Sequence, residues 1–398
     1  MILTAPGSKS MTQRALILGA LSQTTCRVSR PLACDDSRYL TDLLRALGAS
    51  VEWQDGEVVI APPRDLRAPV APVFCGNAGT AIRFGACLSL LAAGTLHLDG
   101  DAHMRKRPIG PLGDALAASN VEVTYLGDPG CPPLLLRRRG PTPPQITVDS
   151  TLSSQYASGL MLVAPRLPGG LELDLGGDVV SKPYLVMTEA MMRAAGATLE
   201  RLDARRLAIA PGAYRAERLE VEPDWSGAAF LLAAGFVTGR DVTVAGLLPP
   251  EQSLQGDAVF LHQLAALRAP EAAVHRFDLT DAPDLIAPLV AACLFADRPT
   301  LIRGAAHTRI KESDRVAVLA RELGKLGAHL TVHDDGLDVE PLAAIPEGSF
   351  ALDPDDDHRM AMAFGVVGLR VPGLSVTTPE CVSKSFPSFW PTLARFRT

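Results

Sequence analysis

The chain has 398 residues, of which 47% are hydrophobic and 21% are charged, and its formal net charge is −6. This composition excludes a disordered or fibrous chain, and the length predicts two domains of roughly 200 residues each. An acidic balance with only two short basic runs, at 105–107 and 137–139, argues against nucleic acid as a partner.

The sequence also argues against membrane and metal partners. No apolar run reaches the roughly 18 residues that a bilayer span needs, so we expect no membrane partner and a cytoplasmic location. The seven cysteines are odd in number and lack CxxC spacing, and the eight histidines are dispersed. We therefore expect neither a disulfide framework nor a metal site. Nothing such as a heptad pattern forces a dimer, and a monomer is expected.

The first predicted elements are a short strand and a helix. The strand is broken by Pro6 and Gly7, and the helix opens at Lys9 with apolar residues at positions 16, 17, 20 and 21. Ser8 or Ser10 would cap this helix.

A unit that repeats along the chain follows. A helix at 43–49 stops at Gly48, and two strand-like runs, 51–53 and 58–61, are joined through Asp55-Gly56. The same order returns at 110–138, 191–210 and 320–339. Such copies indicate a repeated supersecondary unit, about three in each half of the chain. The Pro- and Gly-containing stretch 211–224 is the predicted domain crossing.

Basic or small hydroxyl residues stand where several helices are predicted to begin. Each start alone is typical of an ordinary helix cap, but together they favour anion sites for a small polyanion in a cleft between two lobes. The six starts are 7–14, 76–83, 150–156, 180–184, 309–315 and 357–360, and two basic loops, 105–110 and 383–387, accompany them.

The segment RIKESDR, 309–315, has the densest charge of these starts. Its three basic residues surround Glu312 and Asp314, directly before an apolar helical pattern. We expect these charges on the first helical turn, with Lys311 and Arg315 four residues apart on one face and Glu312 as a proton carrier. The alternative is a solvated helix start with ordinary ion pairs.

Ten motifs in the chain resemble, in order, those of the 5-enolpyruvylshikimate-3-phosphate synthase family. They are PGSKSMTQRALIL (6–18), GNAGTAIR (76–83), RKRPIG (105–110), SSQY (153–156), SKPY (181–184), QGD (255–257), PDL (283–285), RIKESDR (309–315), DHRMAMAF (357–364) and KSFP (384–387). The resemblance implies a two-domain inside-out α/β barrel, each domain with three βαβαββ-type repeats around buried helices. The implied lobes are 9–212, and 1–8 plus 213–398, with the active site in the cleft between them.

The resemblance also implies a reaction. The enolpyruvyl group of phosphoenolpyruvate would pass to the 5-hydroxyl of shikimate 3-phosphate without a cofactor, with Asp284 as base, Glu312 as acid and Lys9 as a further catalytic residue. The residues implied to bind shikimate 3-phosphate are Lys9, Ser10, Arg14, Ser153, Ser154, Gln155, Ser181, Tyr184, Asp284 and Lys311. Those implied to bind phosphoenolpyruvate are Lys9, Gly79, Arg107, Gln155, Arg315, Arg359 and Lys384. His358 is expected to position its neighbours rather than to act in catalysis.

The chain departs from the family's pattern at several positions. Only five residues precede Pro6, where the family usually has a longer first strand, so the lobe crossing there is expected to be incomplete. Phe84 stands where a proline is usual and could change the affinity for phosphoenolpyruvate or for glyphosate, the family's inhibitor. His103 and His307 replace a basic residue and an asparagine. After 261–270, the hairpin of the fifth repeat is nearly absent before Asp284.

Two alternatives remain open. The related UDP-N-acetylglucosamine enolpyruvyltransferases share the repeat and the donor, but they carry a reactive cysteine in the loop that corresponds to 105–110, where this chain has none. A non-catalytic phospho-ligand-binding relative would keep the cleft without turnover. The presence of both Asp284 and Glu312 argues against it, because binding alone requires neither an acid nor a base.

Overall fold

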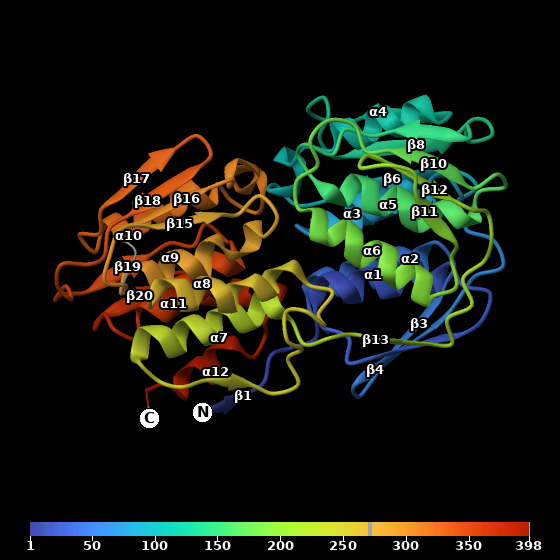
Figure 1. The fold of residues 1–398 in the computed structure, drawn as a ribbon. Coiled ribbons are helices and arrows are strands. Elements are labelled where there is room, and N and C mark those ends of the chain that lie inside the picture. Colours follow the sequence, from blue (N-terminus) through green and yellow to red (C-terminus); the bar gives the residue numbers. More distant parts are fainter. Residues whose placement is uncertain (270–272, 398) are drawn as a thin grey trace. The chain divides into compact units, whose positions relative to one another are not determined.

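The computed structural model describes residues 1–269 and 273–397, and the chain forms two compact units (Figure 1). We call Gly7–Val221 the N-terminal unit, and Met1–Pro6 with Glu222–Thr398 the C-terminal unit. The expected lobe boundary, after residue 212, differs from the observed boundary between the units, which lies after Val221. Strand β13 (Arg218–Glu220) pairs in parallel with β2 (Cys26–Ser29), which keeps the residues up to 221 with the N-terminal unit.

The N-terminal unit contains three four-stranded sheets with one topology. Their strand orders are β13-β2-β4-β3, β5-β6-β8-β7 and β9-β10-β12-β11, and in each the first pair is parallel and the other two are antiparallel. The remaining strand bounds are β3 (Ser50–Gln54), β4 (Glu57–Ala61), β5 (Val73–Phe74), β6 (Thr95–Asp99), β7 (Val121–Tyr125), β8 (Leu134–Arg138), β9 (Gln145–Thr147), β10 (Leu171–Asp174), β11 (Leu199–Arg201) and β12 (Arg206–Ile209).

Helices form the centre of the N-terminal unit. Helices α1, α3 and α5 contact one another, and almost every residue of each is buried, which is typical of helices that are enclosed on all sides. The helix bounds are α1 (Lys9–Ala20), α2 (Asp35–Ala46), α3 (Gly79–Leu88), α4 (Gly110–Ala118), α5 (Ser154–Val163) and α6 (Lys182–Ala194), with 3-10 turns η1 (Met104–Lys106) and η2 (Ala164–Arg166). Helices inside and sheets outside give the predicted inside-out arrangement.

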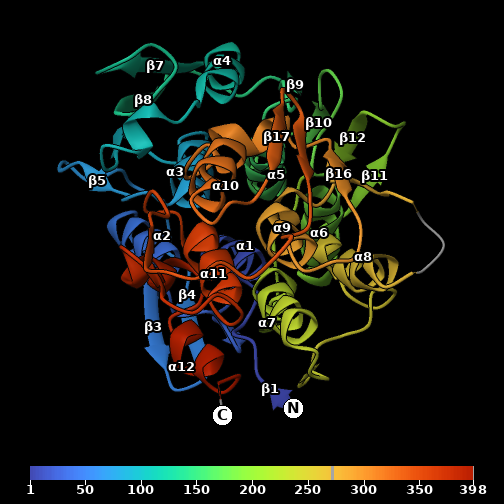
Figure 2. The same ribbon diagram turned by 90° about the vertical axis from the view of Figure 1, so that its left-hand side faces the viewer.

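The C-terminal unit is also built around helices. Helices α7, α9 and α11 contact one another in its core, and Figure 2 shows them side by side. One four-stranded sheet, β15-β16-β18-β17, has the topology of the three sheets above, and two parallel pairs, β1-β14 and β19-β20, complete the described strands. This unit therefore has the same type of repeat, but two of its sheets contain two described strands instead of four.

The bounds in the C-terminal unit are as follows. The strands are β1 (Ile2–Leu3), β14 (Thr243–Val244), β15 (His275–Asp278), β16 (Thr300–Arg303), β17 (Leu330–His333), β18 (Gly336–Val339), β19 (Phe350–Leu352) and β20 (Leu374–Val376). The helices are α7 (Trp225–Thr238), α8 (Phe260–Leu267), α9 (Ile286–Cys293), α10 (Arg315–Gly324), α11 (His358–Val367) and α12 (Phe389–Ala394), with η3 (Gly256–Val259), η4 (Pro283–Leu285), η5 (Ala306–Ile310) and η6 (Pro379–Lys384).

The four predicted copies of a helix followed by a hairpin are confirmed. They correspond to α2-β3-β4, α4-β7-β8, α6-β11-β12 and α10-β17-β18. The turn at Asp55-Gly56 forms as predicted, with Gly56 at a positive φ of 72° that glycine adopts without steric cost. Between α8 and α9 the one described strand is β15, although the end of the segment 261–270 lies outside the described residues.

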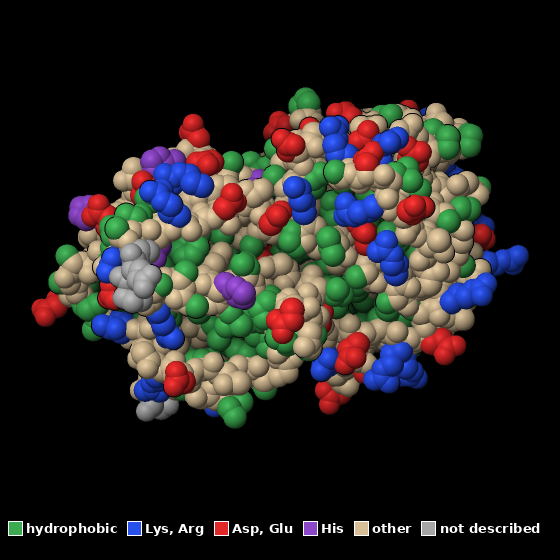
Figure 3. Space-filling view, in the orientation of Figure 1, with side chains coloured by type: hydrophobic (Ala, Val, Ile, Leu, Met, Phe, Trp, Pro, Cys, Tyr) green, Lys and Arg blue, Asp and Glu red, His purple; other side chains and the backbone are tan. Residues whose placement is uncertain are grey.

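The remaining composition-based expectations concern the surface and the cysteines. All seven cysteines are free thiols. On the face drawn in Figure 3, Lys and Arg side chains are mixed with Asp and Glu and form no basic stripe. Within the described part of the chain, no helix is long and apolar enough to cross a bilayer, and no group of His, Cys, Asp and Glu is arranged to hold a metal ion.

Candidate active site

The start of α1 is held against the start of α2 in the N-terminal unit. The Thr12 hydroxyl donates to the Ser8 carbonyl at 2.8 Å and accepts from the Leu32 amide at 3.0 Å. This fixes the loop before α2, so that Lys9 Nζ lies 3.0 Å from Asp36 Oδ2. Ser8 occupies the N-cap position, but its side chain makes no capping bond, in contrast to our expectation for a serine cap.

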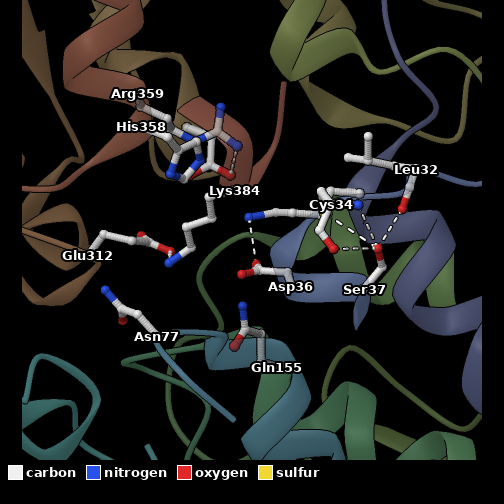
Figure 4. Close-up of polar contacts among 12 residues, drawn as sticks. Leu32, Cys34, Asp36, Ser37, Asn77, Gln155, Glu312, His358, Arg359 and Lys384 are labelled. Carbon is white, nitrogen blue, oxygen red and sulfur yellow. Dashed lines mark hydrogen bonds and ion pairs between the residues drawn. The ribbon is translucent and has the colours of Figure 1, made fainter. Parts of the chain in front are cut away.

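Asp36 is positioned by a hydrogen-bond cluster at the beginning of α2. The Ser37 hydroxyl donates to the Leu32 carbonyl at 2.6 Å and accepts from the Cys34 amide at 2.9 Å (Figure 4). Asp36 is therefore held on the first turn, with 4% of its side chain exposed. The carboxylate orients the Lys9 ammonium.

A second cationic side chain lies at the start of α3. Arg107 Nη1 donates to the backbone carbonyl of Asn77 at 3.2 Å and to its side-chain Oδ1 at 3.0 Å. A Cβ atom on Gly79 would lie 2.8 Å from Arg107 Nη2, so only glycine allows the guanidinium to come this close to the helix start. The first turn of α3 and Arg107 thus form one anion-binding corner.

Helix α5 starts beside this corner. Ser153 is the N-cap of α5, and its hydroxyl accepts from the Gln155 amide at 3.3 Å, as predicted for a serine helix start. The side-chain oxygen of Gln155 accepts from Arg83 Nη1 at 2.7 Å, and Arg83 Nη2 donates to the Pro108 carbonyl at 3.0 Å. Arg83, which we did not predict as a site residue, therefore sets the orientation of Gln155.

Arg14 lies inside the N-terminal unit. Its guanidinium donates to the Thr188 and Ser158 hydroxyls at 2.7 and 3.2 Å and to the carbonyls of Ser10 and Tyr184 at 2.9 and 3.2 Å. Burial lowers the pKa of Arg14 to about 10, which leaves it charged at neutral pH. These contacts join α1, α5 and α6 and hold Tyr184.

The neighbours of Arg14 include two aromatic rings. The guanidinium lies 5.6 Å from the centre of the Phe84 ring and 5.9 Å from that of Tyr184. Tyr184 stands on the first turn of α6, whose N-cap Ser181 has a positive φ of 57°. Phe84 is buried and packs against Arg14, so its direct contact is with this cation and the helix interior.

The C-terminal unit brings together both predicted proton carriers. Arg315 Nη1 lies 2.8 Å from Asp284 Oδ1, and Arg315 Nη2 lies 2.9 Å from Glu312 Oε2. The Arg315 side chain is only 1% exposed, and its Nε atom lies 2.8 Å from Asp357 Oδ2. One buried guanidinium therefore holds three carboxylates in fixed directions.

Two further cations complete this cluster. Arg359 Nη2 lies 2.8 Å from Asp284 Oδ2, and Lys384 Nζ lies 3.2 Å from Glu312 Oε1. Figure 4 shows Lys384 and Glu312 pointing toward one another. We define Asp284, Glu312, Asp357, Arg315, Arg359 and Lys384 as the carboxylate–cation cluster, in which three negative and three positive side chains balance.

The predicted helix start at 309–315 is corrected by the structure. Helix α10 begins at Arg315, because Asp314 is its N-cap and accepts from the Ala317 amide at 3.0 Å. Lys311 follows η5 with a non-helical ψ of −140° and lies outside α10. Lys311 and Arg315 therefore do not share a helix face, and Glu312 stands in the turn between η5 and α10.

The surrounding cations keep Asp284 ionised. Burial acts to raise the pKa of Asp284, but Arg359, Arg315 and Lys311 outweigh burial and hold this pKa well below its usual range. Burial and the Lys311 charge lower the pKa of His307 to about 4. His358 is fully buried, with its Nδ1 3.6 Å from Asp357 Oδ1, and its positioning role stays a prediction.

Asp257, from the QGD motif, is a buried carboxylate close to this cluster. It lies on η3 with 3% of its surface exposed, and the Ser226 hydroxyl donates to its Oδ2. Burial raises the pKa of Asp257 to about 7, the Asp284 charge adds to this, and Arg359 opposes it.

The raised pKa of Asp257 predicts a pH-dependent stability. The pKa of an unfolded aspartate is about 3.9, so between about pH 4 and pH 7 the folded protein holds a proton that the unfolded chain has released. The free energy of unfolding should therefore fall as pH rises, by on the order of 2 kcal/mol between pH 5 and pH 8 from this group. Urea unfolding at pH 5 and at pH 8 should show that the free energy of unfolding falls less in Asp257→Asn than in wild type.

The exposed residue Asp297 provides the control for this measurement. The variant Asp297→Asn should keep the wild-type difference between pH 5 and pH 8. An unchanged difference in Asp257→Asn would contradict the assignment of this proton to Asp257.

Each unit thus gathers its own set of predicted residues. The N-terminal unit brings Lys9, Gly79, Arg107, Ser153 and Gln155 to helix starts. Sequence analysis missed Asp36, Asn77 and Asp357, which hold cations, and Arg83, which orients Gln155. Asn77 and Arg83 lie in GNAGTAIR and Asp357 opens DHRMAMAF, so these three stood as neighbours within the motifs, whereas Asp36 lies outside all ten motifs.

Comparison with known proteins identifies the family. Residues 1–393 match the model of the EPSP synthase (3-phosphoshikimate 1-carboxyvinyltransferase) family. A 3-phosphoshikimate 1-carboxyvinyltransferase from Methanoculleus marisnigri is 40% identical over 98% of this chain and 95% of its own, and one from Rhizobium leguminosarum bv. trifolii is 37% identical over 98% and 92%.

The fold agrees with this match. The structure of an EPSP synthase from Acinetobacter baumannii superposes with a TM-score of 0.79 over 99% of this chain and 95% of its own, at 24% sequence identity. The resemblance recognised from the ten motifs is confirmed, and the predicted two-domain α/β fold with it. The chain belongs to the EPSP synthase (3-phosphoshikimate 1-carboxyvinyltransferase) family.

Proposed function

We propose that this chain transfers the enolpyruvyl group of phosphoenolpyruvate to the 5-hydroxyl of shikimate 3-phosphate and releases phosphate. The observation that supports this best is the pairing of one buried guanidinium, Arg315, with both Asp284 and Glu312. Addition of a hydroxyl to the enol phosphate of phosphoenolpyruvate needs a base and an acid in fixed relation, because carbon C2 becomes electrophilic only as C3 gains a proton.

The proposed steps use these two carboxylates. Asp284 takes the proton of the 5-hydroxyl as its oxygen bonds to C2, and Glu312 gives a proton to C3. The C2–O bond to phosphate then breaks, the departing phosphate takes the proton held by Asp284, and C3 returns its proton to Glu312, which restores the double bond. Nearby cations keep Asp284 ionised, so it is in the form that can accept the proton. Glu312 must become protonated, which the charge of the bound substrates would favour.

The remaining predicted residues would bind the two anionic substrates. We assign the phosphate of phosphoenolpyruvate to Lys9, Arg107 and Lys384, and its carboxylate to Arg315 and Arg359. Shikimate 3-phosphate is assigned to Ser10, Ser153, Ser154, Gln155, Ser181, Tyr184 and Lys311. The placement of Arg14 supports an indirect part in this, through its bond to the Tyr184 carbonyl. A monomeric state and a cytoplasmic location also stay predictions.

Phosphate release tests the proposal directly. Phosphate should appear from phosphoenolpyruvate only when shikimate 3-phosphate is present, and UDP-N-acetylglucosamine should not replace it. The variants Asp284→Asn and Glu312→Gln should each lose this activity, while the exposed control Asp281→Asn should retain it. Binding of shikimate 3-phosphate without any phosphate release would instead favour a non-catalytic relative.

The contact between Gly79 and Arg107 gives a further prediction. In Gly79→Ala, the new Cβ would force the Arg107 guanidinium away from the start of α3. We expect the KM for phosphoenolpyruvate to rise by about tenfold, since a charge-assisted hydrogen bond contributes about 1.5–3 kcal/mol. The free energy of unfolding should change by less than about 1 kcal/mol, because the moved atoms end a flexible side chain.

Gly85 in the same helix is the matched control. A Cβ there would lie 2.5 Å from Leu43 Cδ1 in the packed interior. Gly85→Ala should therefore lower the free energy of unfolding by about 1–3 kcal/mol and leave the KM unchanged. Steady-state kinetics and urea unfolding of both variants give the comparison, and equal KM values for the two would contradict the assigned role of Arg107.

A further inference from the structure

The N-terminal unit contains a cavity that the proposed reaction does not use. Its volume is about 580 Å³, within the range of sites that hold small organic molecules. The cavity is lined by Ala20, Leu21, Ser22, the segment 63–67, Leu90, Leu91, Ala93, Arg138, Pro141, Thr142, Pro144 and the segment 166–170. We call it the distal cavity.

The distal cavity lies at the opposite end of the central helices from the predicted substrate residues. Ala20 is the last residue of α1, whose first residue is Lys9, and Leu90 follows α3, which begins at Gly79. Arg166 likewise follows α5, which begins at Ser154. Because 12 residues of α-helix extend about 18 Å, a ligand in this cavity would be separate from the predicted substrate residues of this unit.

The charges around the distal cavity favour an anion. Four arginines line it, Arg64, Arg67, Arg138 and Arg166, against one carboxylate, Asp65. Arg166 Nη1 donates to the Leu21 carbonyl at the end of α1 at 3.1 Å, which offsets the negative end of that helix. Four positive charges at one cavity of a chain with net charge −6 form a local anion-attracting site.

Three of these arginines have unused hydrogen-bonding capacity. Among the residues that the structure describes, the side chains of Arg64, Arg67 and Arg138 make no hydrogen bond or ion pair. Neighbouring Arg139, outside the cavity, is paired with Glu122 through its Nε at 2.8 Å. Each guanidinium could therefore donate a bidentate pair of hydrogen bonds to a carboxylate or phosphate.

The walls of the distal cavity are partly apolar, and backbone hydrogen bonds fix one part of them. Leucine and proline side chains form much of the lining, namely Leu21, Leu66, Leu90, Leu91, Leu167, Pro63, Pro141, Pro144 and Pro168. The Ala68 amide donates to the Ala93 carbonyl at 2.8 Å, and the Ala93 amide donates to the Leu66 carbonyl at 3.0 Å. A ligand with an apolar body would bury that body here without reordering the wall.

We propose that the distal cavity binds a small organic anion, with a ring-sized apolar body against the leucines and prolines and carboxylate or phosphate groups on the arginines. The short basic run at 137–139 has no role in the proposed reaction. It supplies one of these arginines, Arg138.

Adjacent residues of β8 supply a matched pair of variants. Arg137 and Arg138 are both exposed on this strand, where successive side chains point to opposite faces, and only Arg138 lines the cavity. Arg138→Gln should weaken binding of benzene-1,3-dicarboxylate to the full chain by tenfold or more, as measured by isothermal titration calorimetry. Arg137→Gln should leave the affinity unchanged, and the double variant Arg64→Gln/Arg67→Gln should also bind weakly.

Two further probes separate charge from the apolar body. The neutral benzene-1,3-dicarboxamide should bind at least tenfold more weakly than the dicarboxylate, and so should inorganic phosphate. Circular dichroism should show that all variants are folded, since the substituted arginines are exposed. Equal affinity of the dicarboxylate for wild type, Arg138→Gln and the double variant would overturn the proposal, as would no binding to wild type.

Discussion

Replacement of Glu312 by glutamine should lower kcat by at least about a hundredfold, the usual loss when a general acid is removed. Glutamine keeps the shape of the side chain, and its amide oxygen can still accept from Arg315 or Lys384, which lie 2.9 and 3.2 Å from the carboxylate. It has no proton to give to C3 of phosphoenolpyruvate. The KM for shikimate 3-phosphate should change by less than about threefold, because only the reacting step is affected.

Phosphate release at saturating substrates measures this loss of kcat. A double variant tests whether the two carboxylates act on the same step. If Asp284 and Glu312 act on one step, Asp284→Asn/Glu312→Gln should be little slower than the slower single variant, since residues that act as a unit are not additive. Asp281→Asn, three residues before Asp284 and exposed, should have the wild-type kcat. A Glu312→Gln enzyme within threefold of wild type would remove Glu312 from the proton transfer.

The repeats could be predicted from sequence because their signals are local. A helix with a glycine stop and a hairpin with Asp55-Gly56 each depend on residues within about 20 positions. The helix starts at Lys9, Gly79 and Ser154 were predictable for the same reason, because small and hydroxyl residues favour the first turn. All four hairpin copies and these starts appear where the pattern placed them.

The partners of the site residues could not be predicted, because they come from distant parts of the chain. The motif implies that Arg14 binds substrate, and that remains a prediction, but only the structure reveals that its Nε donates to Thr188, which is 174 residues away. The predicted start of α10 was wrong for a different reason. Asp314 is a better N-cap than the residues before it, and a local reading could have placed Lys311 outside the helix. Strand β13 joins the N-terminal unit through β2, and that pairing has no local signal.

Replacement of Arg315 by methionine should lower the free energy of unfolding by about 3–5 kcal/mol, the usual cost when one partner of a buried ion pair is removed. The change leaves Asp284, Glu312 and Asp357 without the guanidinium that contacts all three. Arg139→Met is the control, because Arg139 pairs with Glu122 through its Nε at 2.8 Å but is exposed, and its loss should cost less than about 1 kcal/mol.

The pH dependence of this difference distinguishes a lost ion-pair network from lost packing. The folded-state pKa of Asp284 is lowered by its cations, so the stability that they provide is present above the unfolded pKa of about 3.9 and is lost as pH falls below it. The difference in the free energy of unfolding between wild type and Arg315→Met should therefore become smaller from pH 7 to pH 3, as measured by urea unfolding. A difference that stays constant over this range would mean that Arg315 stabilises the core through its packed side chain rather than through charge.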